Sequence, residues 1–306
     1  MQKAYVTALY DLIRKDKKVI SCLSDSGTDY DELIAREFPD QVINFGISEN
    51  TQLAAAAGMA AAGKIPFVYT TGAFIAYRSY EFLRDDICLQ NRNVKLIGMG
   101  TGLAWSTLGA THHTTEDIAL LYSMPNLTVI TPASPAELIG AVKAAYELEG
   151  PVYIRMGMSG EKEIYGEEYE FALGDNVVVR EGKDLTIFVT GSIISEVISA
   201  AEMLESNGIS VRITNVHTLK PVNTEQILSV CNDHDRIVTV EEHNVNGGLG
   251  TIISDVIAGA GLPVRIRKIG LQDRFAIGFG NRSDVLKMNG LDASDIAETI
   301  AEYFRS

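Results

Sequence analysis

The chain has 306 residues, 46% of them hydrophobic and 22% charged, which is ordinary for a globular protein in solution. Its length suits two domains of about 150 residues each. The formal net charge is −14 and the sequence has no cluster of basic residues, which argues against a nucleic-acid-binding surface.

Residue usage also bears on the compartment. The three cysteines are scattered along the chain: Cys22, Cys88 and Cys231. Without a C-x-x-C pair they predict neither a disulfide framework nor a zinc site, and a reducing cytoplasm is the simplest setting. Residues 1–4 lack the apolar core of a signal peptide. Lys64 and Pro66 interrupt the apolar stretch 53–77 well short of a membrane span, so we expect no membrane partner.

The first half of the chain alternates helical and strand patterns. Strands are predicted at residues 19–23, 42–45, 66–69, 94–98, 128–130 and 152–155. Helices are predicted at residues 5–15, after Ser48, at residues 80–90 and after Ser134. The strands are continuous apolar runs, which is typical of a mainly parallel sheet covered on both faces.

An acidic, glycine-containing stretch at residues 157–169 predicts a linker, after which the alternation restarts. The second half has predicted strands at residues 185–189, 210–213, 236–240 and 264–269, and predicted helices at residues 195–207, 224–231 and 250–258. The predicted fold class is therefore α/β. It consists of two doubly wound domains, at residues 1–165 and 175–306, of which the second is the smaller.

A carboxylate, Glu49, opens an alanine-rich helix. Ser48 is a good N-cap, and an acidic residue in the first turn is favoured by the helix dipole. Because the helix has little side-chain bulk, another backbone can lie close against it. Glu49 is then either a helix cap, which the local sequence favours, or an acid whose pKa is raised at a dry interface.

Two glycine clusters resemble nucleotide-binding loops only weakly. In the cluster that starts at Gly98, Leu103 stands where the dinucleotide fingerprint needs its third glycine, and no good helix follows. The cluster 247–250 is better interpreted as a tight turn between a strand and a helix.

The aromatic residues Phe74, Tyr77 and Tyr80 are spaced three apart. On a regular helix they would share a face. That face would either pack in the core or form a shelf on which a flat heterocycle stacks.

Two adjacent histidines, His112 and His113, precede a predicted helix in a loop. Neighbouring side chains in a loop usually point in different directions, so a two-histidine metal pair is not expected. One of them is suited to proton transfer near neutral pH. The acids that follow, Glu116 and Asp117, are interpreted as structural.

Together these segments resemble the C-terminal half of the transketolase family. The resemblance is to a pyrimidine-binding domain followed by a transketolase C-terminal domain, and it covers residues 5–304. It rests on residues 45–50, the aromatic set 74, 77 and 80, and residues 111–113, 124–127, 131–133, 150–155, 241–244 and 247–250.

This resemblance implies thiamine diphosphate as the cofactor. In the family, the glutamate equivalent to Glu49 bonds N1′ of the aminopyrimidine, and the 4′-nitrogen then removes the C2 proton of the thiazolium. A two-carbon ketol unit passes from a ketose to an aldose. The resemblance implies a cofactor-binding set of Glu49, Phe74, Tyr77, Tyr80 and Asp25. It implies a substrate-binding set of His112, His113, Arg155 and Asp29, with Glu49 and His112 as the catalytic residues.

The diphosphate-binding motif of the family is missing. Its nearest likeness, residues 174–176, lies in the wrong domain. The resemblance therefore implies one subunit of a split transketolase, with no metal site of its own. An N-terminal subunit would carry the diphosphate and a Mg²⁺ or Ca²⁺ ion. The small-residue helix after Glu49 would pack at a subunit interface, and two copies of each chain would form an α2β2 assembly.

Departures from the family pattern bear on the sugar substrates. Gly100 stands near where the family has a phosphate-binding histidine, Leu108 replaces an aspartate, and His113 replaces a glutamine. Trp105 occupies a loop that is normally small and acidic. The hypothesis that follows is a donor or acceptor other than the standard pentose phosphates, such as a modified, sulfonated or deoxy sugar.

Two alternatives remain open from the sequence. One is the β subunit of a 2-oxoacid dehydrogenase E1 component, which shares both domains and the glutamate. The context of His112 and the chain length favour transketolase over it. The other, from a different class, is a transketolase-like module that binds without catalysing.

Overall fold

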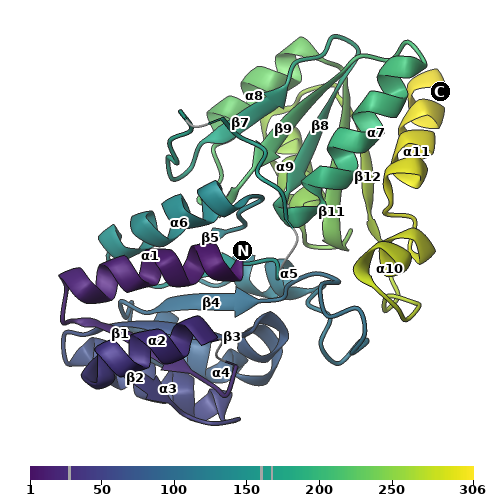
Figure 1. The fold of residues 1–306 in the computed structure, drawn as a ribbon. Coiled ribbons are helices and arrows are strands. Elements are labelled where there is room, and N and C mark those ends of the chain that lie inside the picture. Colours follow the sequence, from purple (N-terminus) through teal and green to yellow (C-terminus); the bar gives the residue numbers. More distant parts are fainter. Residues whose placement is uncertain (27–28, 159–160, 167) are drawn as a thin grey trace.

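The computed structural model describes residues 1–26, 29–158, 161–166 and 168–306, without the side chains of residues 29–31. It has a seven-stranded and a five-stranded sheet, each covered by helices (Figure 1). The first half contains α1 (Gln2–Lys15), β1 (Val19–Leu23), α2 (Asp29–Glu37), η1 (Pro39–Gln41), β2 (Val42–Asn44), α3 (Glu49–Ala61), β3 (Ile65–Thr71), η2 (Phe74–Arg78), α4 (Tyr80–Phe82), η3 (Leu83–Cys88), β4 (Lys95–Met99), α5 (Asp117–Tyr122), β5 (Thr128–Ile130), α6 (Pro135–Glu147) and β6 (Val152–Arg155).

The second half contains β7 (Asn176–Arg180), β8 (Leu185–Thr190), η4 (Gly191–Ile193), α7 (Ile194–Ser206), β9 (Val211–Val216), β10 (Thr218–Lys220), α8 (Thr224–Asp233), β11 (Arg236–Asn244), α9 (Leu249–Ala260), β12 (Arg265–Leu271), α10 (Arg282–Met288) and α11 (Ala293–Arg305). In the part of the chain described, the helices are all too short or too polar to cross a bilayer.

The first sheet is parallel except at one edge. Its strand order is β10-β5-β6-β4-β3-β1-β2. Cys22 of β1 lies opposite Ile43 on one side and Val68 on the other, and every residue of β1 is buried. The predicted parallel sheet of continuous apolar strands is confirmed. The carboxyl ends of β1, β3 and β4 therefore meet at one edge, where ligands bind in open α/β sheets.

Helices cover both faces of this sheet. On one face α1 and α6 lie side by side (Figure 1), and their apolar residues, such as Leu9 and Leu138, form one core cluster with the sheet. On the other face α3 and the helical segments that follow β3 pack through Leu53 and Leu83. Since α3 is confined to this face, the position of its first residue is fixed at the sheet edge.

The second sheet has the strand order β12-β11-β8-β9-β7, with only β7 antiparallel. Helices α7 and α11 pack on one face and α8 and α9 on the other. The two sheets are also joined. Strand β10, from the second half, pairs antiparallel with β5 of the first sheet, and one apolar cluster runs from Leu53 to Ile253.

Several elements differ from the sequence-based expectation. The predicted set does not include β7, β10, α2, α10 or α11. Strand β10 has three residues and forms only because β5 lies beside it, so local sequence carries little signal. Helix α11, by contrast, has an N-cap of a type that the sequence can indicate: the Asp292 side chain accepts a hydrogen bond from the Asp295 amide. The domain boundaries stay a prediction.

The turn between β11 and α9 is closed by a carboxylate of the same strand. Glu241 accepts hydrogen bonds from the amides of Leu249 (2.7 Å) and Gly250 (2.8 Å). A Cβ atom at Gly248 would lie 1.8 Å from Glu241 Oε2, so a side chain there would displace the carboxyl group from the turn. The tight-turn interpretation is thus confirmed, and the protein's own carboxyl group occupies the helix N-terminus. Burial raises the pKa of Glu241 from 4.5 to about 7.

This raised pKa predicts a pH dependence of stability. Between pH 4.5 and about 7 the folded state keeps a proton that the unfolded state has released, so the free energy of unfolding falls as pH rises. Glu241→Gln removes this titration. We expect the wild type to lose up to roughly 3 kcal/mol more than the variant across that window.

The measurement is urea unfolding of both proteins at several pH values across the window. The comparison of slopes, not of absolute stabilities, matters, because glutamine can accept only one of the two amide hydrogen bonds. Equal slopes for the two proteins would show that Glu241 does not titrate there.

Candidate active site

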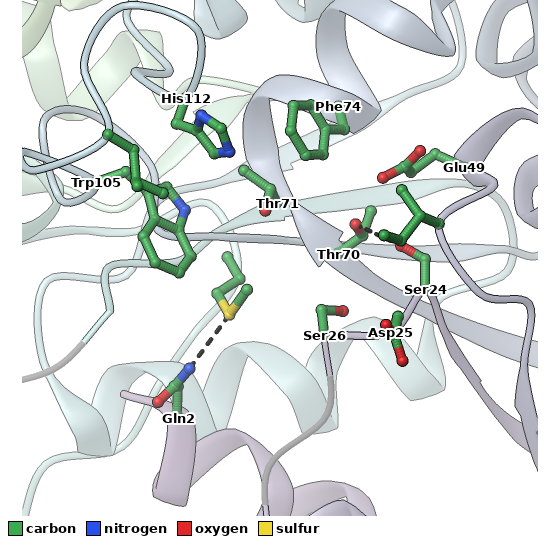
Figure 2. Close-up of a pocket in the computed structure, with 13 residues that line it drawn as sticks. Gln2, Ser24, Asp25, Ser26, Glu49, Thr70, Thr71, Phe74, Trp105 and His112 are labelled. Carbon is green, nitrogen blue, oxygen red and sulfur yellow. Dashed lines mark hydrogen bonds between the residues drawn. The ribbon is translucent and has the colours of Figure 1, made fainter.

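A cleft of about 380 Å³ opens at the carboxyl ends of β1, β3 and β4. Figure 2 shows its walls, with Glu49 at one end, Trp105 and His112 at the other, and Phe74 between them. The lining residues are Gln2, Ser24, Asp25, Ser26, Ile47, Glu49, Thr70, Thr71, Phe74, Met99, Trp105, Leu108 and His112.

Glu49 is the first residue of α3, and its side chain is 2% exposed. Its Oε2 accepts a hydrogen bond from Arg78 Nη1 at 2.6 Å. The Arg78 guanidinium also lies over the Phe74 ring, 4.1 Å from the ring centre. Ser48 does not cap α3 with its side chain, which bonds Thr51 instead. The Glu49 carboxylate therefore faces the cleft and an arginine, not a free helix amide.

The three aromatic residues do not share one face. The segment η2 is a π-helical turn, which is wider than an α-helical turn, so residues spaced three apart diverge. Phe74 lines the cleft. The Tyr77 hydroxyl donates to Glu116 and accepts from the amides of Thr115 and Glu116, outside the cleft lining. Tyr80 packs against the core beside α3. Of the three rings in the predicted aromatic shelf, only that of Phe74 lines the cleft.

The two histidines point in different directions, as expected. His112 lines the cleft, with its ring centre 5.2 Å from that of Phe74 and 6.3 Å from that of Trp105. His113 is 3% exposed, and its ring nitrogens find no hydrogen-bond partner among the described residues. Burial lowers the pKa of His113. Only His112 can reach a molecule in the cleft; His113 lies behind the wall.

Arg155 occupies a different place from the one expected. Its Nε donates to both carboxylate oxygens of Asp117, at 2.9 and 3.1 Å. Its Nη2 donates to the carbonyls of Thr114 (2.8 Å) and Glu242 (3.1 Å). Arg155 is buried and outside the cleft lining. Its Nε and Nη2 are thus engaged within the protein, and its role at the anionic end of a substrate stays a prediction. Asp117 is structural, as interpreted from the sequence.

Two acids are predicted from the sequence to lie near the cofactor and substrate. Asp25 lines the cleft, at the end of β1, with φ of 52°, and its amide donates to Asn44 Oδ1. This left-handed backbone turns the chain at the sheet edge. The side chain of Asp29 lies outside the described residues, so its role stays a prediction.

The second domain holds the loop that carries Trp105. Glu242 Oε1 accepts a hydrogen bond from the Leu103 amide at 2.6 Å, and Arg282 pairs with the same carboxylate. A Cβ atom at Gly102 would lie 2.8 Å from the Glu242 side chain, so the loop passes close to it. The sequence gives no local signal for this contact, because Leu103 and Glu242 are 139 residues apart.

Several other lining residues are not predicted from the sequence. Ser24 follows β1, Thr70 and Thr71 end β3, and Met99 ends β4. Their position at strand ends is a signal that could have found them. Gln2 lies on α1 and reaches Met99 Sδ at 3.2 Å, a contact that only the packing of α1 produces.

The lining suits one kind of ligand. A buried carboxylate beside an aromatic ring can hold a flat heterocycle through a ring nitrogen and a ring face. Among the described lining residues there is no lysine or arginine to pair with phosphate groups. Within the described ranges, no group of three or more His, Cys, Asp or Glu side chains is arranged to hold a metal ion.

Comparisons with known families match both halves of the chain. Residues 1–159 match the model for the transketolase pyrimidine binding domain, and residues 174–296 match the model for the transketolase C-terminal domain.

Relatives match over nearly full length. An apulose-4-phosphate transketolase subunit of Actinobacillus succinogenes is 35% identical over 263 residues, which cover 86% of this chain and 85% of that one. The 6-deoxy-6-sulfo-D-fructose transketolase subunit of Clostridium sp. (strain MSTE9) is 33% identical, and the match covers 99% of this chain and 94% of that one. A solved structure, described as a split gene transketolase, inactive beta4 tetramer, superimposes with a TM-score of 0.91 at 34% identity, covering 99% of this chain and 98% of that one.

The Arg155–Asp117 pair leads to a stability prediction. In Asp117→Asn, Arg155 keeps its charge in a buried site without the carboxylate. We expect the free energy of unfolding to fall by about 3 kcal/mol or more. The measurement is equilibrium unfolding in urea.

The matched control is Glu205→Gln, which breaks the exposed pair between Glu205 and Arg180. Its cost should not exceed about 1 kcal/mol. If Asp117→Asn costs no more than the control, the pair does not stabilise the fold as described.

Proposed function

Because the chain belongs to the transketolase family and matches its C-terminal half, we propose that it is the C-terminal subunit of a split, thiamine-diphosphate-dependent transketolase. With an N-terminal partner subunit it transfers a two-carbon ketol unit from a ketose to an aldose. The observation that carries this proposal is the buried Glu49 carboxylate beside the Phe74 ring, at the ligand-binding edge of the first sheet.

The residues of the cleft fit the pyrimidine end of the cofactor. Thiamine diphosphate, once bound, supplies the carbon nucleophile that attacks the ketose carbonyl. With the cofactor bound, Glu49, which is 2% exposed, would share a proton with a nitrogen of the pyrimidine ring. Phe74 contacts the ring face, and Asp25 approaches from the end of β1. Arg78 donates to Glu49 Oε2, which leaves Oε1 to meet a ring nitrogen.

His112 is the substrate-facing residue of this chain. Its imidazole lines the same cleft as Glu49, and Thr111 Oγ1 lies 2.9 Å from its Nδ1. A hydrogen bond at Nδ1 leaves Nε2 for a sugar hydroxyl, and the threonine hydroxyl can serve either tautomer because it can donate or accept. His112 therefore binds the substrate and passes a proton to or from it during ketol transfer.

The partner supplies what the lining lacks. Without a described cation in the cleft, the diphosphate and its Mg²⁺ or Ca²⁺ ion are held by the N-terminal subunit. The outer face of α3 is open: a Cβ atom at Gly58 would meet no described atom within 4 Å, and Thr51 and Ala61 are exposed. A second backbone can approach this face closely, which supports a subunit contact through α3. The proposed assembly is α2β2, and its proposed compartment is the cytoplasm.

The alternative functions have less support. The relatives with near-complete matches carry transketolase names, which favours ketol transfer over the β subunit of a 2-oxoacid dehydrogenase E1 component. The cleft combines Glu49, Phe74 and His112, which favours an enzyme over a binding module. If the reconstituted complex acylated lipoamide, the function as an E1 β subunit would be favoured over ketol transfer.

The role of Glu49 is tested by Glu49→Gln in the complex with the N-terminal subunit. Glutamine keeps the size of the side chain but cannot hold the acidic proton. We expect ketol transfer to fall by roughly 100- to 10,000-fold, because general acid–base terms are of that size. Turnover is measured with a panel of ketose donors and aldose acceptors.

The matched control is Glu81→Gln, an exposed acid on α4. It should retain full turnover, and both variants should unfold at the temperature of the wild type. Near-normal turnover of Glu49→Gln would remove Glu49 from the mechanism.

A further inference from the structure

One wall of the cleft is apolar and belongs to the loop after β4. Trp105 and Leu108 lie in this loop, and Met99 ends the strand before it. Figure 2 shows the Trp105 indole across the cleft from Glu49, next to His112. Leu108 is 49% exposed. A molecule that reaches from Glu49 past His112 would meet this wall.

The Trp105 indole fits where it does because Gly100, next to it, has no side chain. Gly100 has φ of 66°, and a Cβ atom there would lie 2.3 Å from Trp105 Nε1. The ring therefore fills the space that any side chain at position 100 would need. Trp105 Nε1 is buried and has no hydrogen-bond partner among the described residues. The ring thus offers carbon surface to the cleft.

The electrostatics of the cleft disfavour an anion at this wall. The charged residues of the lining are both acids, Asp25 and Glu49. No lysine or arginine is among the described lining residues: Arg78 pairs with Glu49 at the other end of the cleft, and Arg155 is buried against Asp117. A phosphate or sulfonate placed against Trp105 would lose its hydration without gaining a cation.

Other hydrogen-bonding side chains line the same cleft. Gln2 Nε2 is engaged with Met99 Sδ at 3.2 Å and with the Tyr69 hydroxyl at 3.4 Å, and sulfur is a weak acceptor. Ser26 and His112 complete the set. Such groups around an aromatic face match a chain of hydroxyl-bearing carbons, whose C–H groups pack on the ring while the hydroxyls exchange hydrogen bonds.

We infer that Trp105 is a specificity-determining residue that binds the uncharged, hydroxyl-bearing segment of the sugar. Any phosphate or sulfonate on the sugar must then bind outside the Trp105 wall. The inference rests on the proposed function, which supplies the sugar, and it concerns which part of that sugar this chain contacts.

The kinetic test uses Trp105→Ala and Trp105→Arg in the complex with the N-terminal subunit. The substrates are D-erythrose and erythrose 4-phosphate as acceptors, with one common donor. For Trp105→Ala we expect kcat/KM to fall at least about tenfold, through KM, by the same factor for both acceptors. For Trp105→Arg we expect no gain for the phosphorylated acceptor relative to the neutral one. Unchanged kcat/KM in Trp105→Ala, or a tenfold relative gain in Trp105→Arg, would overturn the inference.

A second readout does not depend on turnover. Trp105 is the only tryptophan in the chain, so the emission difference between the wild-type complex and a Trp105→Phe complex reports on this wall alone. D-xylulose should change that difference saturably, and inorganic phosphate should not. A response to phosphate, or none to D-xylulose, overturns the inference. A response to D-xylulose in a complex that transfers no ketol unit would instead refute the proposed function and leave the inference standing.

Discussion

The buried pair between Arg155 and Asp117 joins the parts on which the cleft depends. Arg155 ends β6 of the first sheet, Asp117 begins α5, and the same guanidinium binds the carbonyl of Glu242 in the second domain. Two charges in a dry site are costly unless each is satisfied, so this arrangement tolerates little displacement. It fixes the loop that ends at Thr114, and with it His112, relative to the sheet edge.

Contacts between the two domains also fix the rest of the cleft. Glu242 lies between the Leu103 amide and Arg282, so the loop that carries Trp105 is held by the second domain. Strand β10 and the apolar cluster from Leu53 to Ile253 prevent the domains from separating. The second domain thus contributes to the site by holding a loop of the first domain, while the described lining residues all come from the first.

The sequence predicts the fold well and the site in part. Continuous apolar strands between helices are a strong signal, and the parallel sheets follow from it. Asp25 and Phe74 closely follow the ends of β1 and β3, Glu49 begins the helix after β2, and His112 lies in the loop after β4. Tyr77 does not lie on the shared face that its spacing predicts, since a π-helical turn cannot be recognised from spacing. The role assigned to Arg155 rested on resemblance, and its actual partner, Asp117, lies 38 residues away.

The sequence by itself determined the two α/β halves, their parallel strands and the acid that begins the alanine-rich helix, because these depend on local periodicity and on residue type. Only the tertiary structure decided which arginine meets which carboxylate: Arg78 approaches Glu49, and Arg155 is buried against Asp117. It alone placed the Trp105 ring in the space left by Gly100. Such pairings follow from the packing of distant segments, where burial and charge are settled together and no local pattern records the outcome.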